Sequence, residues 1–428
     1  MTTTLATPTT GSRAETVQIV RSAGGITAWL VEDYAVPLVA FDIAFHGGAA
    51  QDPAGKQGTV ALMAGLLDEG AGTMDADAYH RALDDKAIEI SFSADRDLVT
   101  GRAKTLSRNL DAAVELLRLA VCEPRFDASA VERVRQQLSA SIRREAKDPD
   151  ALASRAWREA AFPNHPYGHP VRGTLESLAA ITRDDVVEAH TALVTRGSLK
   201  IAVVGAIDAD TLRATLDRAF GALPAAPRLR PIADVMIGRG GRREVIDLDI
   251  PQATLRFGTN GIPRLDDDHM AGVVLNHILG GGVFSARLFR EVREKRGLAY
   301  SVYSQLATFD HASIFSGGTS TKNERAAESL SVIEDEIRKL TEDGPTADEL
   351  DKAKKYLTGS YALRFDSSLK IASQLVHLQA EGIEVGYLDQ RNPLIEAVTL
   401  EDTHRVARRL FGDAGLLVTV VGRPVGIV

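Results

Sequence analysis

Apolar residues along the chain follow two different periods, and these predict blocks of sheet and blocks of helix. From Ile26 to Leu30 and from Ile88 to Ala94, apolar residues occupy alternate positions, which is typical of strands with one buried face. From Leu110 to Val121 and from Ala130 to Ile142, they recur at every third or fourth position, which predicts amphipathic helices. Strands that come early and helices that follow favour an α+β layer in which helices cover one face of a sheet.

The same pattern occurs twice in the chain. A threonine with acidic residues after it, an apolar helix and an apolar strand ending in glycine run from Thr182 to Gly205 and again from Thr399 to Gly422. Further blocks repeat at nearly the same offset: Val114–Val121 with Leu330–Ile337, Val131–Leu138 with Leu350–Leu357, and Pro37 with Pro251. Nearly constant offsets predict an internal duplication with small changes in loop length.

Length and turn residues place the boundary between the two copies. The 428 residues exceed one ordinary domain. The segment Leu223–Gly241 is rich in proline and glycine, which is typical of an exposed linker. We therefore expect an N-terminal α+β domain over 1–222, a linker over 223–243 and a C-terminal α+β domain over 244–428. Each domain should be a mostly antiparallel sheet covered by helices.

Composition and charge exclude several classes of function. The net charge is −8 and no long block of like charges occurs, so nucleic acid is not an expected partner. No run approaches the roughly 18 apolar residues of a membrane span. A single cysteine, Cys122, excludes an internal disulfide framework and a multi-cysteine zinc site. The first residues lack the pattern of a signal peptide, which favours a cytoplasmic protein, or a periplasmic one if a leader was removed.

The second copy contains the most specific motif of the chain. The glycines Gly280, Gly281 and Gly282 precede a charged helical stretch that ends at Gly297, and a strand containing Tyr300 follows. The glycines are explained by a turn as well as by a loop that faces substrate.

Arg293 and Tyr300 are the candidate chemical groups of this motif. Arg293 lies near the predicted end of the helix and Tyr300 on the strand, so both side chains can project toward one place. A guanidinium and a phenol are donors suited to a peptide carbonyl and to the negative charge that develops on it during hydrolysis. The structural alternatives are a solvated helix face for Arg293 and a half-buried strand aromatic for Tyr300.

With this motif the chain resembles the pitrilysin/insulinase family of zinc metallopeptidases over nearly all of both halves. The segment Phe162–Gly168, with the sequence FPNHPYG, is similar to the family's segment after its metal-ligand helices. The family fold is a duplicated α+β domain, which agrees with the internal repeat. The resemblance implies that Arg293 and Tyr300 are the residues that bind the substrate carbonyl.

The zinc site that the family requires is missing from the sequence. It needs two histidines four apart on a helix, a glutamate between them as general base, and a distant glutamate as third ligand. The resemblance places Ala61 at the first histidine, Ala64 at the base and Gly65 at the second histidine. Alignment on Asp148–Pro149 places Ser141 at the third ligand. All four chemical positions are therefore lost.

No substitute site is evident in the sequence. No pair among the ten histidines brackets a glutamate on a helix, and His165 and His169 lie in a loop of prolines and glycines. The pair Asp68–Glu69 is interpreted as a solvated helix end. Neither a nucleophile elbow nor a phosphate-binding loop occurs. We expect no peptide hydrolysis by this chain alone.

In the family's small two-chain forms, one chain carries zinc and the other carries the arginine and tyrosine. The resemblance implies that this chain is the non-zinc subunit of a heterodimeric metalloendopeptidase that acts on extended peptides. It would hold no cofactor itself, and zinc would lie in a homologous partner subunit. Two alternatives stay open: a structural or peptide-binding subunit without a peptidase role, as in respiratory complexes, and a self-sufficient metalloenzyme.

Overall fold

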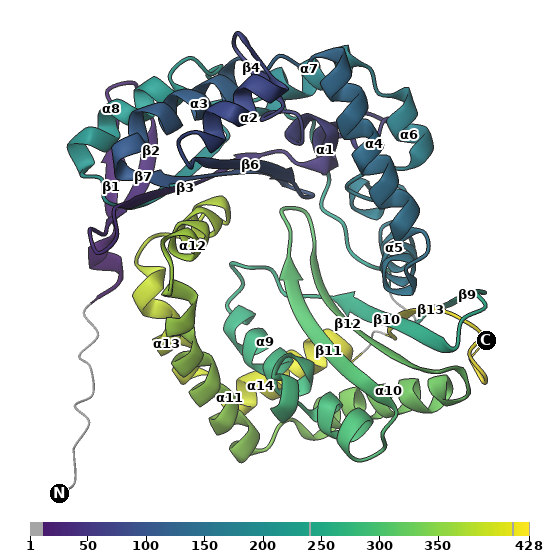
Figure 1. Ribbon diagram of the computed structural model, residues 1–428. Helices are drawn as coiled ribbons and strands as arrows, with labels where there is room; N and C mark the ends of the chain where they lie inside the picture. The colour runs from purple at the N-terminus through teal and green to yellow at the C-terminus, as the bar shows by residue number, and fades with distance from the viewer. Residues whose placement is uncertain (1–11, 239–240, 413–414, 428) are drawn as a thin grey trace, which may run out of the picture.

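The computed structural model describes residues 12–238, 241–412 and 415–427, which form two halves of the same design (Figure 1). The first half holds a six-stranded sheet in which β2 and β8 are parallel and all other neighbours are antiparallel. Its strands in spatial order are β1 (Gln18–Arg21), β2 (Thr27–Glu32), β8 (Leu199–Gly205), β3 (Leu38–His46), β7 (Leu98–Leu106) and β6 (Glu89–Ala94). A small separate hairpin joins β4 (Gly70–Ala71) and β5 (Met74–Asp75).

Helices cover one face of this sheet and form the first core with it. The helices of the first half are α1 (Thr59–Ala64), α2 (Ala76–Asp84), α3 (Leu110–Cys122), α4 (Ala128–Glu145), α5 (Pro149–Ala161), α6 (Leu175–Ala180), α7 (Arg183–Leu193) and α8 (Ala209–Phe220). Phe41, Ile43 and Phe45 of the central strand β3 are buried in this core together with Leu117 and Leu216. Every helix of the group except α5 contributes side chains to it.

The second half holds a five-stranded sheet in which only β13 and β9 are parallel. Its strands in spatial order are β11 (Ala299–Thr308), β12 (Ser313–Lys322), β10 (Gln252–Asn260), β13 (Leu417–Val421) and β9 (Arg243–Ile246). Its helices are α9 (His269–Asn276), α10 (Ala326–Asp343), α11 (Ala347–Gly359), α12 (Ser368–Ala380), α13 (Tyr387–Ala397) and α14 (Leu400–Phe411). All of these helices except α12 contribute to the second core.

The predicted duplication and fold class are confirmed by equivalent elements in the two halves. Helices α7 and α14 both begin with a capping box, in which Thr182 and Thr399 accept from the third helical residue. The strands that follow, β8 and β13, lie antiparallel to β3 and β10. β8 ends at Gly205 and β13 ends just before Gly422, and both glycines have a strongly positive φ, 139° and 137°. Both halves are therefore α+β layers with mostly antiparallel sheets.

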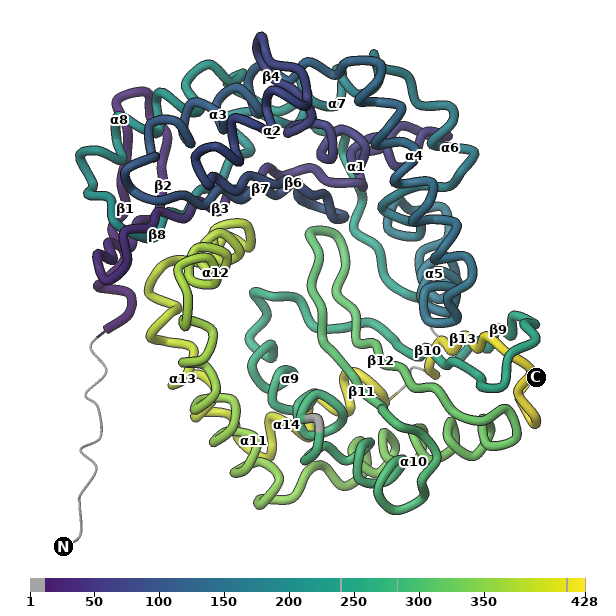
Figure 2. The backbone as a smooth tube through the Cα atoms, viewed as in Figure 1, coloured from purple at the N-terminus to yellow at the C-terminus, as the bar shows by residue number. Residues whose placement is uncertain are grey.

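Each half places one helix against the other half's sheet (Figure 2). Helix α5 packs on β10 and β13, where the indole N–H of Trp157 donates to the Leu417 carbonyl at 2.9 Å. Helix α12 packs on β3 and β8, where the Gln379 amide donates to the Ile201 carbonyl at 2.9 Å. This exchange joins the halves through buried contacts as well as through the chain.

The connection between the halves has no helix or strand among its described residues until Arg243, where β9 begins. It is less exposed than its prolines and glycines predict, because Leu223 and Ile237 are buried. The boundaries over 223–243 stay a prediction. No helix in the described part of the chain has both the length and the apolar character needed to cross a membrane.

Candidate substrate-binding site

The three consecutive glycines pack closely against neighbouring backbone. Gly280 is buried in a π-helical turn, η5 (His277–Gly281), and a Cβ on it would lie 2.6 Å from the backbone nitrogen of Ser304 on β11. A Cβ on Gly281 or Gly282 would come within 2.8 Å of a polar atom of the preceding turn. None of the three has a positive φ. Close packing, rather than the φ of a tight turn, therefore excludes larger residues at Gly280.

The charged stretch after the glycines folds largely as a second π-helix, η7 (Phe289–Glu294), instead of the regular helix that its pattern predicts. Its central carboxylate, Glu291, is nearly buried and accepts hydrogen bonds from Lys295 at 2.7 Å and Arg296 at 2.8 Å. Burial alone would raise the pKa of Glu291, but these two cations lower it below its ordinary value. Glu291 thus neutralises the cations around it.

A buried ion pair attaches this stretch to the helices behind it. Arg287 donates to both carboxylate oxygens of Glu349 on α11, at 2.8 and 2.6 Å. Burial opposes ionisation of Glu349, but the hydrogen bonds from Arg287 and Thr346 lower its pKa to about 2. The pair therefore stays ionised at neutral pH and fixes the position of η7 against α11.

Arg293 differs from the other cations of the stretch because no described residue forms an ion pair with it. Its guanidinium carbon lies 4.6 Å from the ring centre of Tyr300 and 4.8 Å from that of Phe289. These are cation–π distances. Tyr300 is 82% exposed. The structure thus brings the two predicted residues together and leaves their donors available to a ligand.

Tyr300 lies near the start of β11, which is an edge strand of the second sheet. The register between β11 and β12 shifts between Ala299 and Val302, and such irregularities redirect side chains near functional sites. An edge strand also offers backbone groups that an extended peptide can pair with. Chemically, the site can bind a peptide carbonyl through a guanidinium and a phenol beside a free strand edge.

The four positions at which the family's zinc site is missing lie on or next to α1 and α4. Ala61 and Ala64 belong to α1, Gly65 follows it, and Ser141 lies on α4. A Cβ on Gly65 would lie 3.2 Å from Cγ1 of Val134, so α4 stands directly in front of this position. None of the four carries an imidazole or carboxylate. Within the described ranges, no group of three metal-ligating side chains occurs. The residues present do not fit a zinc ion.

Family models match both halves of the chain. Residues 30–175 match the model described as insulinase (peptidase family M16), and residues 180–357 match the one described as the peptidase M16 inactive domain. This chain belongs to peptidase family M16. The missing ligand and base positions on α1 and α4 lie within residues 30–175, the part that matches the insulinase model, whereas Arg293 and Tyr300 lie within the part that matches the inactive domain.

Two relatives and one solved structure extend the comparison. A protein of Helicobacter pylori named non-peptidase homolog YmxG is 29% identical over 78% of this chain and 77% of its own length. An uncharacterized zinc protease of Mycobacterium tuberculosis is 29% identical over 85% of this chain and 84% of its own. The crystal structure of a peptidase M16 inactive domain from Pseudomonas fluorescens has a TM-score of 0.89 and 27% identity, covering 96% of this chain and 99% of that one.

The M16 segment Phe162–Gly168 joins the two halves. The hydroxyl of Tyr167, which is fully buried, donates to Asp97 at 2.6 Å and accepts from the backbone N–H of His311 at 3.0 Å. The tip of the β11–β12 hairpin is thereby attached to the first sheet. His165 lies in the predicted loop, and its ring contacts a carbonyl of the connection at 3.0 Å.

The interpretation of Asp68–Glu69 as a solvated helix end is wrong. Arg133 of α4 donates to both carboxylate oxygens of Glu69, at 3.1 and 2.6 Å, and only 11% of the Glu69 side chain is exposed. Burial raises the pKa of Asp68 to about 6. This ion pair holds α4 against the segment after α1. Arg133 lies far from Glu69 along the chain, so no local sequence pattern could predict this ion pair.

Two aromatic contacts near the candidate site were not predicted from the sequence. Phe289 lies four residues before Arg293, on the same helical face, and this spacing was an available signal. The ring of Tyr356, 59% exposed, stacks on His277 with 4.9 Å between ring centres. The second contact joins distant parts of the chain, and nothing in its sequence spacing could indicate it.

Proposed function

We propose that this chain is the non-zinc subunit of a heterodimeric M16 peptidase. A homologous subunit would supply the zinc, the attacking water and the general base. This chain would bind an extended peptide and polarise the scissile carbonyl through Arg293 and Tyr300. The observation that carries the proposal is the pairing pattern of η7: its other cations are matched by Glu291 and Glu349, whereas Arg293 is held on two aromatic rings without a carboxylate.

The proposed contribution to catalysis is electrostatic. In the ground state, Arg293 and Tyr300 donate hydrogen bonds to the carbonyl oxygen of the peptide bond. As the tetrahedral intermediate forms, the negative charge on that oxygen grows, and both interactions strengthen. Phe289 limits the rotation of the guanidinium, so little reorganisation is needed when the charge develops.

A second candidate function is a structural or peptide-binding subunit with no peptidase role. The Helicobacter pylori relative is named a non-peptidase homolog, which favours this candidate. The missing ligand positions on α1 and α4 fit both candidates equally. The two differ only in whether Arg293 and Tyr300 matter to hydrolysis.

The decisive experiment compares peptide hydrolysis by this chain, by a zinc-bearing M16 chain of the same organism, and by their mixture. Arg293→Ala and Tyr300→Phe are tested in the mixture, with Arg290→Ala as the matched control on the same π-helix. Activity that appears only in the mixture, falls with both substitutions and survives Arg290→Ala supports the catalytic subunit. If the mixture is no more active than either chain alone, or if its activity is unchanged by both substitutions, the structural subunit is favoured.

A further inference from the structure

Two tyrosines of the edge strand β11 lie on the same face of the second sheet. Side chains alternate along a strand, so residues three apart ordinarily face opposite sides of a sheet. The strand β11 carries one extra residue between Ala299 and Val302, which both belong to the second core. This bulge brings Tyr300 and Tyr303 to consecutive positions on the face that is turned away from that core.

The ring of Tyr303 is held by an arginine two strands away. Arg256 of β10, Gly318 of β12 and Tyr303 of β11 are paired in one row across the sheet. A Cβ on Gly318 would collide with the Arg256 guanidinium, so the absence of a side chain there lets the guanidinium cross β12. The guanidinium carbon lies 5.6 Å from the centre of the Tyr303 ring, which is a cation–π distance.

Arg256 is in turn fixed by the other half of the molecule. Its Nε donates to the Ser154 hydroxyl at 2.9 Å, and its Nη2 lies 3.4 Å from the Asp150 carboxylate. Both partners belong to α5, and only 14% of the Arg256 side chain is exposed. The guanidinium therefore has little freedom, and the ring that packs on it is oriented before a ligand binds.

The Tyr303 ring is nevertheless open to a ligand. Tyr303 is 40% exposed and Tyr300 is 82% exposed. Helix α5 packs on this face of the sheet at β10 and β13, so it leaves the edge at β11 free. In Figure 1 the β11–β12 hairpin reaches toward the first sheet, on the inner side of the molecule. The two tyrosines thus form a continuous exposed surface along the edge strand.

The spacing along this surface matches that of an extended peptide. Consecutive side chains on one face of a strand are roughly 6.5 Å apart, both in β11 and in a bound peptide. A peptide whose carbonyl lies at Arg293 and Tyr300 therefore places the side chain two residues along at Tyr303. An aromatic side chain gains the most there, because aromatic rings attract one another beyond the effect of burial.

We propose that Tyr303 selects peptides with an aromatic side chain two residues from the scissile carbonyl. Arg256 is the positioning residue that holds the ring of Tyr303. This inference rests on the proposed function, since it takes the carbonyl to be bound at Arg293 and Tyr300. It adds the class of substrate that the same site accepts.

The test uses the mixture with a zinc-bearing M16 chain and fluorescence-quenched peptides in matched pairs. The peptides of a pair differ only in carrying phenylalanine or serine two residues from the cleaved bond, and separate pairs vary the two sides of the bond. We expect kcat/KM to be about three- to tenfold higher with phenylalanine, the usual size of an aromatic contact. The preference should occur on one side of the bond only, because Tyr303 lies on one side of the Arg293–Tyr300 pair.

Variants of the ring separate selection from structure. Tyr303→Thr should abolish the preference and leave kcat/KM for the serine peptide unchanged, whereas Tyr303→Phe should keep the preference because the ring remains. Arg256→Gln should weaken the preference through KM of the phenylalanine peptide. Tyr34→Thr changes an exposed tyrosine between β2 and β3 and should have no effect on the preference. The two Tyr303 variants keep the test decisive if Arg256→Gln fails to fold.

Three outcomes would overturn the inference: equal rates for the two peptides of each pair, a preference that survives Tyr303→Thr, or an equal loss with both peptides. Fluorescence anisotropy with unquenched peptides and this chain alone separates its failure from that of the proposed function. If the mixture cleaves neither peptide but the chain binds the phenylalanine peptide more tightly through Tyr303, only the peptidase role fails. If cleavage depends on Arg293 but not on the varied side chain, only this inference fails. Neither cleavage nor binding would overturn both.

Discussion

Two regions of the molecule differ in the side chains that they present. One is the space between α1 and α4 in the first half, and the other is the surface of η7 and β11 in the second half. In the first, ligand-bearing side chains are replaced by Ala61, Ala64 and Gly65, and Val134 lies directly against the last of these positions. In the second, the half-buried Arg293 and the exposed Tyr300 have no carboxylate partners among the described residues. Both halves are α+β layers, but the first region is built on the α-helix α1 and the second on the π-helix η7.

This comparison shows that the two regions differ in how their charges are paired. Near α1, Glu69 forms an ion pair with Arg133, and this pair holds α4 against the segment after α1. In η7, Glu291 pairs with Lys295 and Arg296 but leaves Arg293 unmatched. A cation left unpaired beside an exposed aromatic ring is available for a ligand, whereas one inside an ion pair is not.

The largest expected effect is on catalysis by the assembled peptidase. Arg293→Ala should lower kcat of the mixture by about 10²–10³-fold, the usual result of removing one donor to a developing oxyanion. The free energy of unfolding should fall by only about 1 kcal/mol, because the guanidinium makes cation–π contacts but no ion pair with a described residue. Steady-state kinetics and urea denaturation measure the two quantities. A fall in activity that matches Arg290→Ala would contradict a special role for Arg293.

Next in size is the effect of enlarging the glycine packed against β11. Gly280→Ala should lower the free energy of unfolding by about 2–3 kcal/mol, because its Cβ would meet the backbone of Ser304. Gly359→Ala is the matched control, since a Cβ there meets nothing within 4 Å. Urea denaturation of both variants gives the comparison. Equal stabilities would show that Gly280 is not required by packing.

A smaller loss of stability should follow when a histidine is placed at Gly65, in the closed space between α1 and α4. Gly65→His should cost about 1–2 kcal/mol of stability, because the new side chain starts 3.2 Å from Cγ1 of Val134. Thermal unfolding measures the loss, and adding Val134→Ala should recover part of it relative to Val134→Ala alone. The double variant Ala61→His, Gly65→His should still lack stoichiometric zinc by elemental analysis. Full zinc occupancy without loss of stability would contradict this account.

The smallest effect concerns the half-buried carboxyl of Asp68. Its folded pKa of about 6 lies above the ordinary value, so ionisation lowers stability as pH rises from about 4 through 6. Asp68→Asn removes this cost and should stabilise the protein by on the order of 1 kcal/mol above pH 6, with no difference below pH 4. Denaturation at a series of pH values tests this. A constant difference at every pH would exclude ionisation of Asp68 as the cause.

The sequence by itself determined the elements and their duplication. Strand alternation in β2 and β6, the capping boxes at Thr182 and Thr399, and the glycines that end β8 and β13 are local features, and each depends on neighbours within a few residues. The residue types on α1 also showed that no zinc ligand stands there. That Arg293 and Tyr300 lie close together was predictable because they flank a single helix-to-strand turn, whereas their role was implied by the family resemblance.

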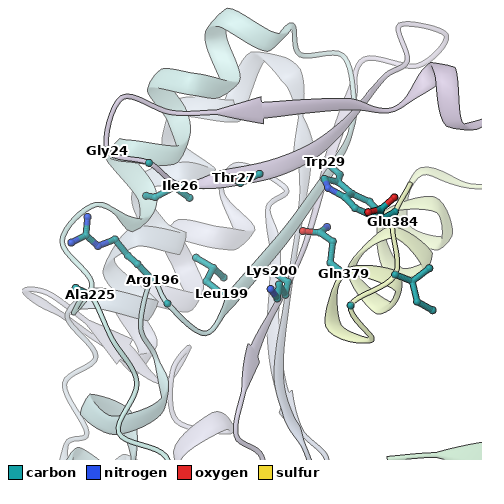
Figure 3. A pocket seen from close by; sticks show the side chains of 14 residues that line it. Gly24, Ile26, Thr27, Trp29, Arg196, Leu199, Lys200, Ala225, Gln379 and Glu384 are labelled. Atoms are coloured by element: carbon teal, nitrogen blue, oxygen red, sulfur yellow. The ribbon is translucent and has the colours of Figure 1, made fainter. Parts of the chain in front are cut away.

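Only the tertiary structure decided which charged groups are available. The pairing of Glu69 with Arg133 and of Arg287 with Glu349 joins residues far apart in the chain, and it separates structural cations from the unpaired Arg293. The exchange of α5 and α12 between the halves, and the pocket of about 550 Å³ that the end of α12 forms with β2 and β8 (Figure 3), likewise depend on packing between the two sheets. Ion pairing and burial depend on distances in space. Local sequence patterns specify single elements and do not specify the distances between them.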